Sequence, residues 1–178
     1  MTTPTDILRA EHVLILQALE TIESAARALD RAASIPDEWW TEMIGWLRGF
    51  ADRNHHAKEE DALFPAMVEK GIPSQGGPIG VMLDEHTRGR LLIRAMESGT
   101  GADRTLSARG YVDLLRAHIA KENEVLFPLA DAVLEPETQR ALAIRFQSLA
   151  DELGIVASLS HAGSALDALA GALSGQPV

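Results

Sequence analysis

The chain is made of long segments in which Ala, Leu, Ile and Glu predominate, separated by short stretches that contain Gly and Pro. Runs of alternating β-branched residues, which are typical of strands, are missing from the sequence. The pattern predicts helices over about 5–33, 36–70, 79–98, 103–134, 135–153 and 155–173. We therefore expect an all-α protein.

Residues with strong preferences for helix ends set these limits. Thr5 can cap the first helix with its hydroxyl, and Pro36 suits the first turn of the second helix. Gly71 supplies a stop after the second helix. Pro65 and Pro128 fall inside a helical pattern, and we expect them to kink or end their helices in matching fashion.

Four long helices joined by short loops are typical of an antiparallel up-down-up-down four-helix bundle. We assign residues 1–135 to this bundle and residues 136–178 to a C-terminal helical extension packed on the same domain. The extension contains one or two additional helices, of which the last is rich in Ala. These helices either cover one end of the bundle or form the contact of a homodimer.

One internal repeat matters more than any other pattern. Residues 55–65 read His-His-Ala-Lys-Glu-Glu-Asp-Ala-Leu-Phe-Pro, residues 118–128 read His-Ile-Ala-Lys-Glu-Asn-Glu-Val-Leu-Phe-Pro, and seven of eleven positions are identical. Each copy lies on the second helix of a predicted hairpin, and each first helix carries a Glu-His pair, at 11–12 or at 85–86. The repeat predicts two helical hairpins of one plan, related by a pseudo-twofold axis.

The repeat also predicts a metal site. Residues four apart share one face of a helix, so each copy presents an imidazole and a carboxylate to the bundle interior, and each first helix can add one more imidazole. Two buried carboxylates that face each other would repel strongly unless cations lie between them. The predicted ligands are His12, His55, Glu59, His86, His118 and Glu122.

The ligand types indicate which metal these residues prefer. Imidazole and carboxylate suit iron or manganese better than calcium, and the absence of cysteine excludes thiolate ligands. We predict two iron ions, for which manganese or zinc could substitute. If both glutamates bridge and each ion takes two imidazoles, each ion has about four protein ligands, and an oxo or hydroxo bridge would make five. Since iron commonly prefers about six ligands, each ion would keep roughly one position for water, O₂, NO or a substrate.

A neighbouring pair offers an alternative to one half of this site. His56 and Glu60 have the same spacing as His55 and Glu59. The repeat favours His55, because His56 and Glu60 align with Ile and Asn in the second copy. We therefore expect His56 beside the ligands or at an interface.

Three other polar residues near the motif have two possible roles each. Glu11 and Glu85 either orient an imidazole by hydrogen bonding or lie in solvent. Arg90, one turn after His86, either faces the site, where it could pair with a carboxylate or an anion, or lies on the surface. His161 has no carboxylate at helical spacing, and we expect it not to be a ligand.

Two further groups are expected to have structural roles only. The lysines that the repeat shares, Lys58 and Lys121, are predicted to lie on the outer face of the bundle. The three tryptophans, Trp39, Trp40 and Trp46, are predicted to pack in the lower core or at an interface.

Composition and charge narrow the classes of function. The chain has 178 residues, enough for one domain with a real core, and no apolar run approaches the roughly 20 residues of a membrane span. The absence of cysteine excludes disulfides and protein-bound iron–sulfur clusters. The net charge of −10 argues against nucleic-acid binding. With no secretory signal pattern at the N-terminus, we expect a cytoplasmic protein that binds neither nucleic acid nor membrane.

The order of these motifs resembles the hemerythrin-like (HHE cation-binding) family. The resemblance rests on a first-helix histidine, two His-x-x-x-Glu motifs followed by Leu-Phe-Pro, and a third-helix histidine, and it covers residues 5–135. It implies a non-haem di-iron centre in a four-helix bundle, with the four histidines as terminal ligands and the two glutamates as bridges. Members bind O₂ reversibly, sense O₂ or iron, or handle NO and assist iron–sulfur cluster repair.

Two departures from the oxygen carriers of that family narrow the expected function. The carriers have a second histidine one turn after the third-helix histidine, where this chain has Arg90, and an aspartate where this chain has Asn123. The ligand set therefore resembles the repair and sensor branches. We expect a di-iron protein that reacts with NO, O₂ or peroxide, in stress response or iron–sulfur repair; the alternative is a module that senses O₂ or iron without turnover.

Overall fold

The computed structural model describes residues 2–31, 33–154 and 158–174, and these residues form helices and no strand. The elements are α1 (Pro4–Asp30), α2 (Asp37–Trp46), η1 (Leu47–His56), η2 (Glu59–Leu63), α3 (Phe64–Glu69), α4 (Gly77–Ser98), α5 (Gly101–Lys121), η3 (Glu122–Leu126), α6 (Phe127–Val133), α7 (Pro136–Glu152) and α8 (Leu159–Ser174), where η marks π-helical segments.

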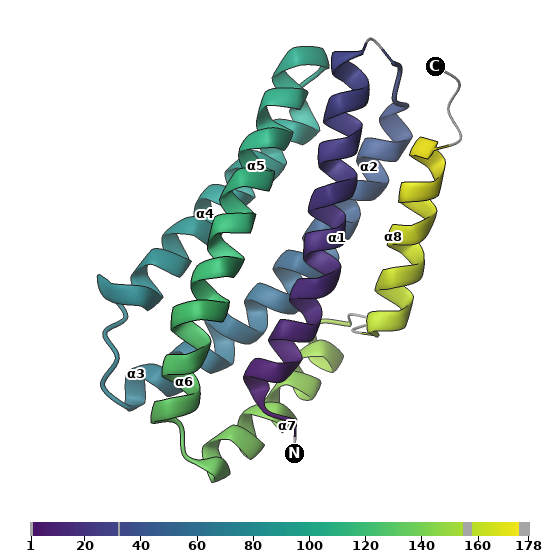
Figure 1. Ribbon diagram of the computed structural model, residues 1–178. Coiled ribbons are helices and arrows are strands. Elements are labelled where there is room, and N and C mark those ends of the chain that lie inside the picture. Colours follow the sequence, from purple (N-terminus) through teal and green to yellow (C-terminus); the bar gives the residue numbers. More distant parts are fainter. Residues whose placement is uncertain (1, 32, 155–157, 175–178) are drawn as a thin grey trace.

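The helices form a bundle of two hairpins. In the first hairpin, α1 is followed by the nearly continuous run from α2 to α3, and in the second, α4 is followed by the run from α5 to α6. Helix α5 packs along both α4 and α1, as Figure 1 shows. The prediction of an all-α bundle with additional C-terminal helices is confirmed, whereas the division at residue 135 into bundle and extension stays a prediction.

The N-cap of the first helix lies two residues earlier than the sequence predicted. Thr3, not Thr5, is the N-cap: its hydroxyl accepts a hydrogen bond from the Asp6 backbone N–H at 3.1 Å, and the Asp6 carboxylate accepts one from the Thr3 N–H at 2.9 Å. The buried Thr5 hydroxyl instead donates to Asp131 at 2.7 Å, which ties α1 to α6. The prediction of Thr5 as the cap is wrong because this long-range partner claims its hydroxyl.

The two repeated prolines are accommodated by π-helical turns. Pro65 and Pro128 lie in the first turns of α3 and α6, directly after η2 and η3. The N–H of the preceding Phe bonds the carbonyl of Glu59 or Glu122, five residues back, so the chain stays helical up to each proline without breaking. Each π-helical turn begins at a glutamate predicted to be a ligand, and such turns are frequent at functional sites.

A polar layer separates two apolar clusters along the bundle. On α1, Leu8 belongs to one cluster and Ile15 to the other, and His12 lies between them. On α4, Met82 and Ile93 bracket the site in the same way. Buried polar groups between two tight apolar clusters have no access to bulk water, so they must find partners among themselves or bind an ion.

The C-terminal helices pack on the bundle. Helix α8 lies against α1 and α2, and α7 contacts α1 and η2 at the end of the bundle where the N-terminus lies (Figure 1). The indoles of Trp39 and Trp46 donate hydrogen bonds to the carbonyls of Leu169 and Ala162 on α8, at 2.9 and 3.0 Å. Trp39 and Trp46 are thus buried against α8, and Trp40 is buried edge-on to Trp39, in agreement with the packing role predicted for all three.

Two remaining predictions concern the last helix and the membrane. The start of the last helix, predicted near residue 155, falls outside the described residues. Among the helices that are described, none combines the length and the apolar character that crossing a membrane requires.

Candidate metal centre

The six predicted ligands converge in the polar layer between the two apolar clusters. Their side chains are buried, and both glutamates are completely inaccessible to solvent. The histidines form two pairs, each with the Nε2 atoms facing: His12 and His55, 3.0 Å apart, are the first pair, and His86 and His118, 3.2 Å apart, are the second pair.

The two glutamates connect these pairs. Glu59 lies with one oxygen 3.7 Å from His55 Nε2 and with the other 3.4 Å from His86 Nε2. Glu122 makes the same kind of contact with the other histidine of each pair, at 3.1 Å in both cases. Each carboxylate therefore spans both pairs, which is the arrangement of two bridging ligands between two ions.

Every paired histidine turns its other ring nitrogen, Nδ1, outward to a side-chain oxygen. The contacts are His12 to Asn123 at 3.1 Å, His55 to Glu11 at 2.9 Å, His86 to Glu60 at 2.7 Å and His118 to Glu85 at 3.0 Å. Carboxylate and amide oxygens accept hydrogen bonds, so Nδ1 carries the proton and the lone pair of Nε2 faces the centre. Such outer oxygens are typical partners of metal-bound histidines.

The outer carboxylates act across helices. Glu11 orients His55 on the neighbouring η1 segment, not the adjacent His12, and Glu85 likewise orients His118 on α5. Of the two readings given to these glutamates, the orienting one is therefore confirmed. The sequence could not show which imidazole each would reach, because that depends on how the hairpins pack.

The repeated lysines belong to the same supports. Lys58 is buried and contacts Glu11, and its Nζ also donates to Asn54 at 2.9 Å. Lys121 contacts Glu85 but leaves 41% of its side chain exposed. The prediction that both lysines lie on the outer face is wrong for Lys58, since packing of α1 against η1 encloses it. The presence of a lysine at the same position in both copies of the repeat was the feature of the sequence that indicated a shared role.

Burial and the charges of neighbouring groups shift the pKa values of the residues in the centre. Burial raises the pKa of Glu59 well above its usual value, and the charge of Glu122 raises it further. Burial opposes ionisation of Glu122 as well, but contact with His118 holds its pKa well below the usual value. Although burial disfavours charge on His118, Glu122 raises the pKa of that imidazole above its ordinary value. Burial lowers the pKa of His55 to about 4, although Glu11 opposes this effect.

The donor set fits two cations. The four carboxylate oxygens of Glu59 and Glu122 are buried without any hydrogen-bond partner. Two ligand atoms bound at about 2.1 Å to one ion are separated by about 3 Å when they lie at right angles, which matches the facing Nε2 atoms. Histidine and glutamate residues in two buried groups thus make a candidate metal site that shares Glu59. That these six residues bind metal stays a prediction.

The second pair has additional polar neighbours. His56, expected beside the ligands, is buried with its ring stacked on His86, at 3.8 Å between centroids. Glu60, weighed as an alternative ligand, turns away to His86 Nδ1 and to Arg90, at 2.7 and 2.8 Å. Arg90 faces this side of the centre and pairs with Glu60 and with Asp52. Asp52 was not predicted, although its position four residues before His56 is a helical signal.

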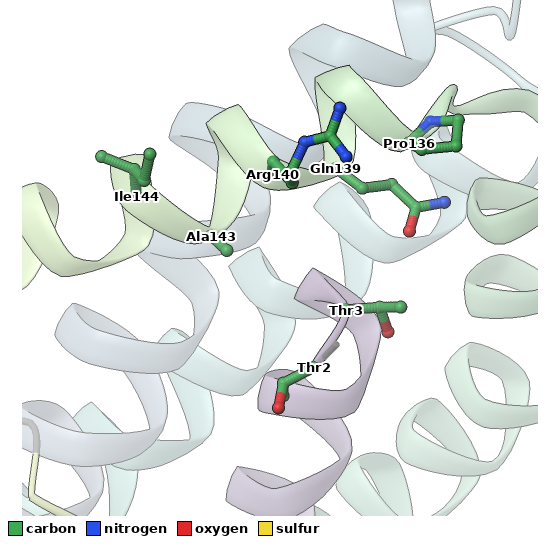
Figure 2. Close-up of a pocket in the computed structure, with 7 residues that line it drawn as sticks. All are labelled: Thr2, Thr3, Pro136, Gln139, Arg140, Ala143 and Ile144. Atoms are coloured by element: carbon green, nitrogen blue, oxygen red, sulfur yellow. The ribbon is translucent and has the colours of Figure 1, made fainter.

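One pocket lies away from the candidate ligands. This pocket, of about 360 Å³, lies between the start of α1 and α7. Its lining residues include Thr2, Gln139 and Arg140 (Figure 2). None of the candidate ligands lines it. A smaller cavity of about 210 Å³ reaches Asp52 and Arg90 on the outer side of the second pair.

Comparison with known proteins agrees with this geometry. The signature of the Hemerythrin HHE cation binding domain matches residues 3–130, which contain all six candidate ligands. The chain belongs to this family. The helices of this hemerythrin-like protein that hold the histidines and glutamates all lie within the matched range.

Curated relatives of this hemerythrin-like chain include proteins named iron-sulfur cluster repair protein YtfE, from Escherichia coli O157:H7 and from Escherichia fergusonii. Each is 38% identical over 90 residues, which cover 43% of this chain and 40% of the relative. The match therefore spans less than half the length of the relatives. No solved structure matches the chain significantly.

Proposed function

We propose that this protein is a non-haem di-iron protein that binds or reacts with small ligands such as NO, O₂ or peroxide. The observation that carries the proposal is the pair of fully buried glutamates whose four oxygens have no hydrogen-bond partner and span two facing histidine pairs. Iron bound there would supply an electron-transferring centre with room for a small ligand. Manganese or zinc could occupy the same nitrogen and oxygen donors.

The protein's own groups would hold and shield such a centre. His12, His55, His86 and His118 would be terminal ligands, and Glu59 and Glu122 would bridge. The outer oxygens keep the proton on each Nδ1, which leaves each Nε2 free to bind. The apolar clusters above and below exclude water, which strengthens the attraction between the carboxylates and the ions.

A role in stress response or iron–sulfur cluster repair extends this proposal. Iron–sulfur cluster repair is supported by the name of the curated relatives, over the part of their length that matches. The alternative is a module that senses O₂ or iron and changes its affinity for a partner without turnover.

The first experiment measures metal content. The protein is loaded with ferrous iron under anaerobic conditions, desalted and assayed for iron, with His161→Ala as a control because His161 is exposed on α8. We expect two iron ions per chain in both proteins. A content far below two would contradict the di-iron proposal.

The second experiment separates reaction from sensing. The reduced, iron-loaded protein is mixed with an electron donor and an excess of either NO or peroxide. The consumption of NO or peroxide is then followed over time. Many turnovers per centre support a catalyst, whereas a single stoichiometric binding event supports a sensor.

A further inference from the structure

His56 has a ring nitrogen without a partner. The residue is 4% exposed, and its Nε2 makes no hydrogen bond to any described residue. Leaving a buried polar nitrogen unpaired is unfavourable, so such a nitrogen points to a missing partner. A helix position next to His55 does not require a histidine, since the equivalent position of the repeat is the buried Ile119.

The ring of His56 points into the second half of the centre. It stacks on His86 with an interplanar angle of 17°, and it meets His118 edge-on at 5.8 Å between centroids. Ligand atoms of His56, Glu59, His86 and His118 all lie within 4.8 Å of one another. His56 therefore shares one potential ion with the second pair.

The π-helical backbone explains how two consecutive histidines reach the same centre. Both His55 and His56 lie at the end of η1. A π-helix has more residues per turn than an α-helix, so consecutive side chains are rotated by less than about 100°. Both rings can therefore point inward, His55 toward His12 and His56 toward His86.

The outer side of His56 is built like that of the four paired histidines. Its Nδ1 lies 3.4 Å from an oxygen of Asp52, and Arg90 holds that same oxygen with its Nε at 2.8 Å. A carboxylate beside Nδ1 keeps the proton there and leaves the Nε2 lone pair facing inward. This is the fifth imidazole in the layer with an outward acceptor and an inward Nε2.

We infer that His56 is a further metal ligand, whose Nε2 binds the ion that His86 and His118 hold. The inference rests on the proposed function, because it requires the two-metal centre. It makes the centre unequal: three imidazoles at the second ion and two at the first. The open position for a small ligand then lies at the ion beside His12 and His55, which has fewer protein ligands.

The test compares the parent with His56→Gln, each loaded anaerobically with ⁵⁷Fe(II), with His161→Gln as the matched surface control. Mössbauer spectra of the parent should show two distinct iron environments of equal weight. In His56→Gln, one environment should change or lose occupancy, with an affinity about 10–100-fold lower at that ion, while the other stays as in the parent. If His56→Gln keeps unchanged spectra and both iron ions, the inference about His56 is wrong, but the proposed di-iron function still stands.

Two further measurements test the inference if His56→Gln does not fold. Asp52→Asn keeps His56 but weakens its outer support, and it should shift the same iron environment by less. In the loaded parent, an anomalous-scattering map should place one iron within about 2.1 Å of His56 Nε2. An iron bound by His86 and His118 but not by His56 would overturn the inference, and a parent that takes up no iron would overturn the proposed function together with it.

Discussion

Each histidine pair has one outer carboxylate that is linked to a lysine, but the remaining neighbours of the two pairs differ. Around the second pair these neighbours are charged groups and an imidazole, whereas the equivalent positions around the first pair are apolar or carry an amide. In the repeat, His56 and Asp52 correspond to Ile119 and Leu115, both buried in an apolar cluster. Arg90, one turn after its pair's α4 histidine, has Leu16 as its counterpart on α1.

The residues of the site therefore fall into an inner set, which would contact the metal ions, and an outer set, which contacts the inner histidines. The two glutamates and the four paired histidines are equivalent in the two halves. The outer residues differ, and they set the proton positions, the local charge and the number of donors at each ion. A symmetric plan can thus produce two unequal metal positions.

The largest effect is expected where the halves share a residue. Because Glu59 belongs to both groups of candidate ligands, Glu59→Gln should reduce iron from two ions per chain to below one. Iron analysis after anaerobic loading and desalting checks this, with His161→Ala as the control. A variant that keeps both ions would mean that this carboxylate is not a bridge.

A second comparison concerns the stability of the metal-free protein. Glu11→Gln leaves the buried Lys58 without its carboxylate and should lower the free energy of unfolding by about 3 kcal/mol. Glu85→Gln frees Lys121, which is 41% exposed, and should cost less than about 1 kcal/mol. Urea denaturation of both variants measures the difference, and equal losses would show that the two supports are equivalent.

The affinity for metal should depend on pH. The pKa of His118 is raised by Glu122, and the pKa of Glu59 is raised by burial and by Glu122, so both groups tend to hold protons that metal must displace. Affinity should therefore rise with pH through the neutral range, by about tenfold per pH unit for each proton released. Competition with a chelator at pH 6 and pH 8 measures this, and an affinity that falls over this range would have the wrong sign.

The smallest effect on metal affinity is expected from giving His86 the same kind of hydrogen-bond acceptor that His12 has. Glu60→Gln gives His86 an amide oxygen as its acceptor, as Asn123 gives His12. Since an amide still accepts the Nδ1 hydrogen bond, the affinity of the second ion should fall by no more than about tenfold. Iron Mössbauer spectra before and after the change report the two ions separately. A change confined to the first ion would reverse the assignment of Glu60.

The sequence predicted the fold and the inner residues because both depend on local periodicity. Four-residue spacing places His55 with Glu59 on one face whatever the rest of the chain does. The repeat then relates that face to the second hairpin, so all six candidate ligands could be named. The bundle follows from long helices with short loops.

The outer residues could not be predicted because they depend on contacts between helices. The burial of Lys58, and the choice of His55 by Glu11, require knowing how α1 packs against η1. The π-helical turns before Pro65 and Pro128 were missed as well, because proline in a helical pattern is equally compatible with a kink or an end. Each miss concerns tertiary packing or a local change in helix type.

The most direct test of the central claim is an anomalous-scattering map, recorded at the iron absorption edge from crystals of the loaded protein. The account predicts two peaks in the polar layer, with Glu59 and Glu122 each contacting both. A single peak, peaks outside this layer, or either glutamate turned toward solvent would contradict it.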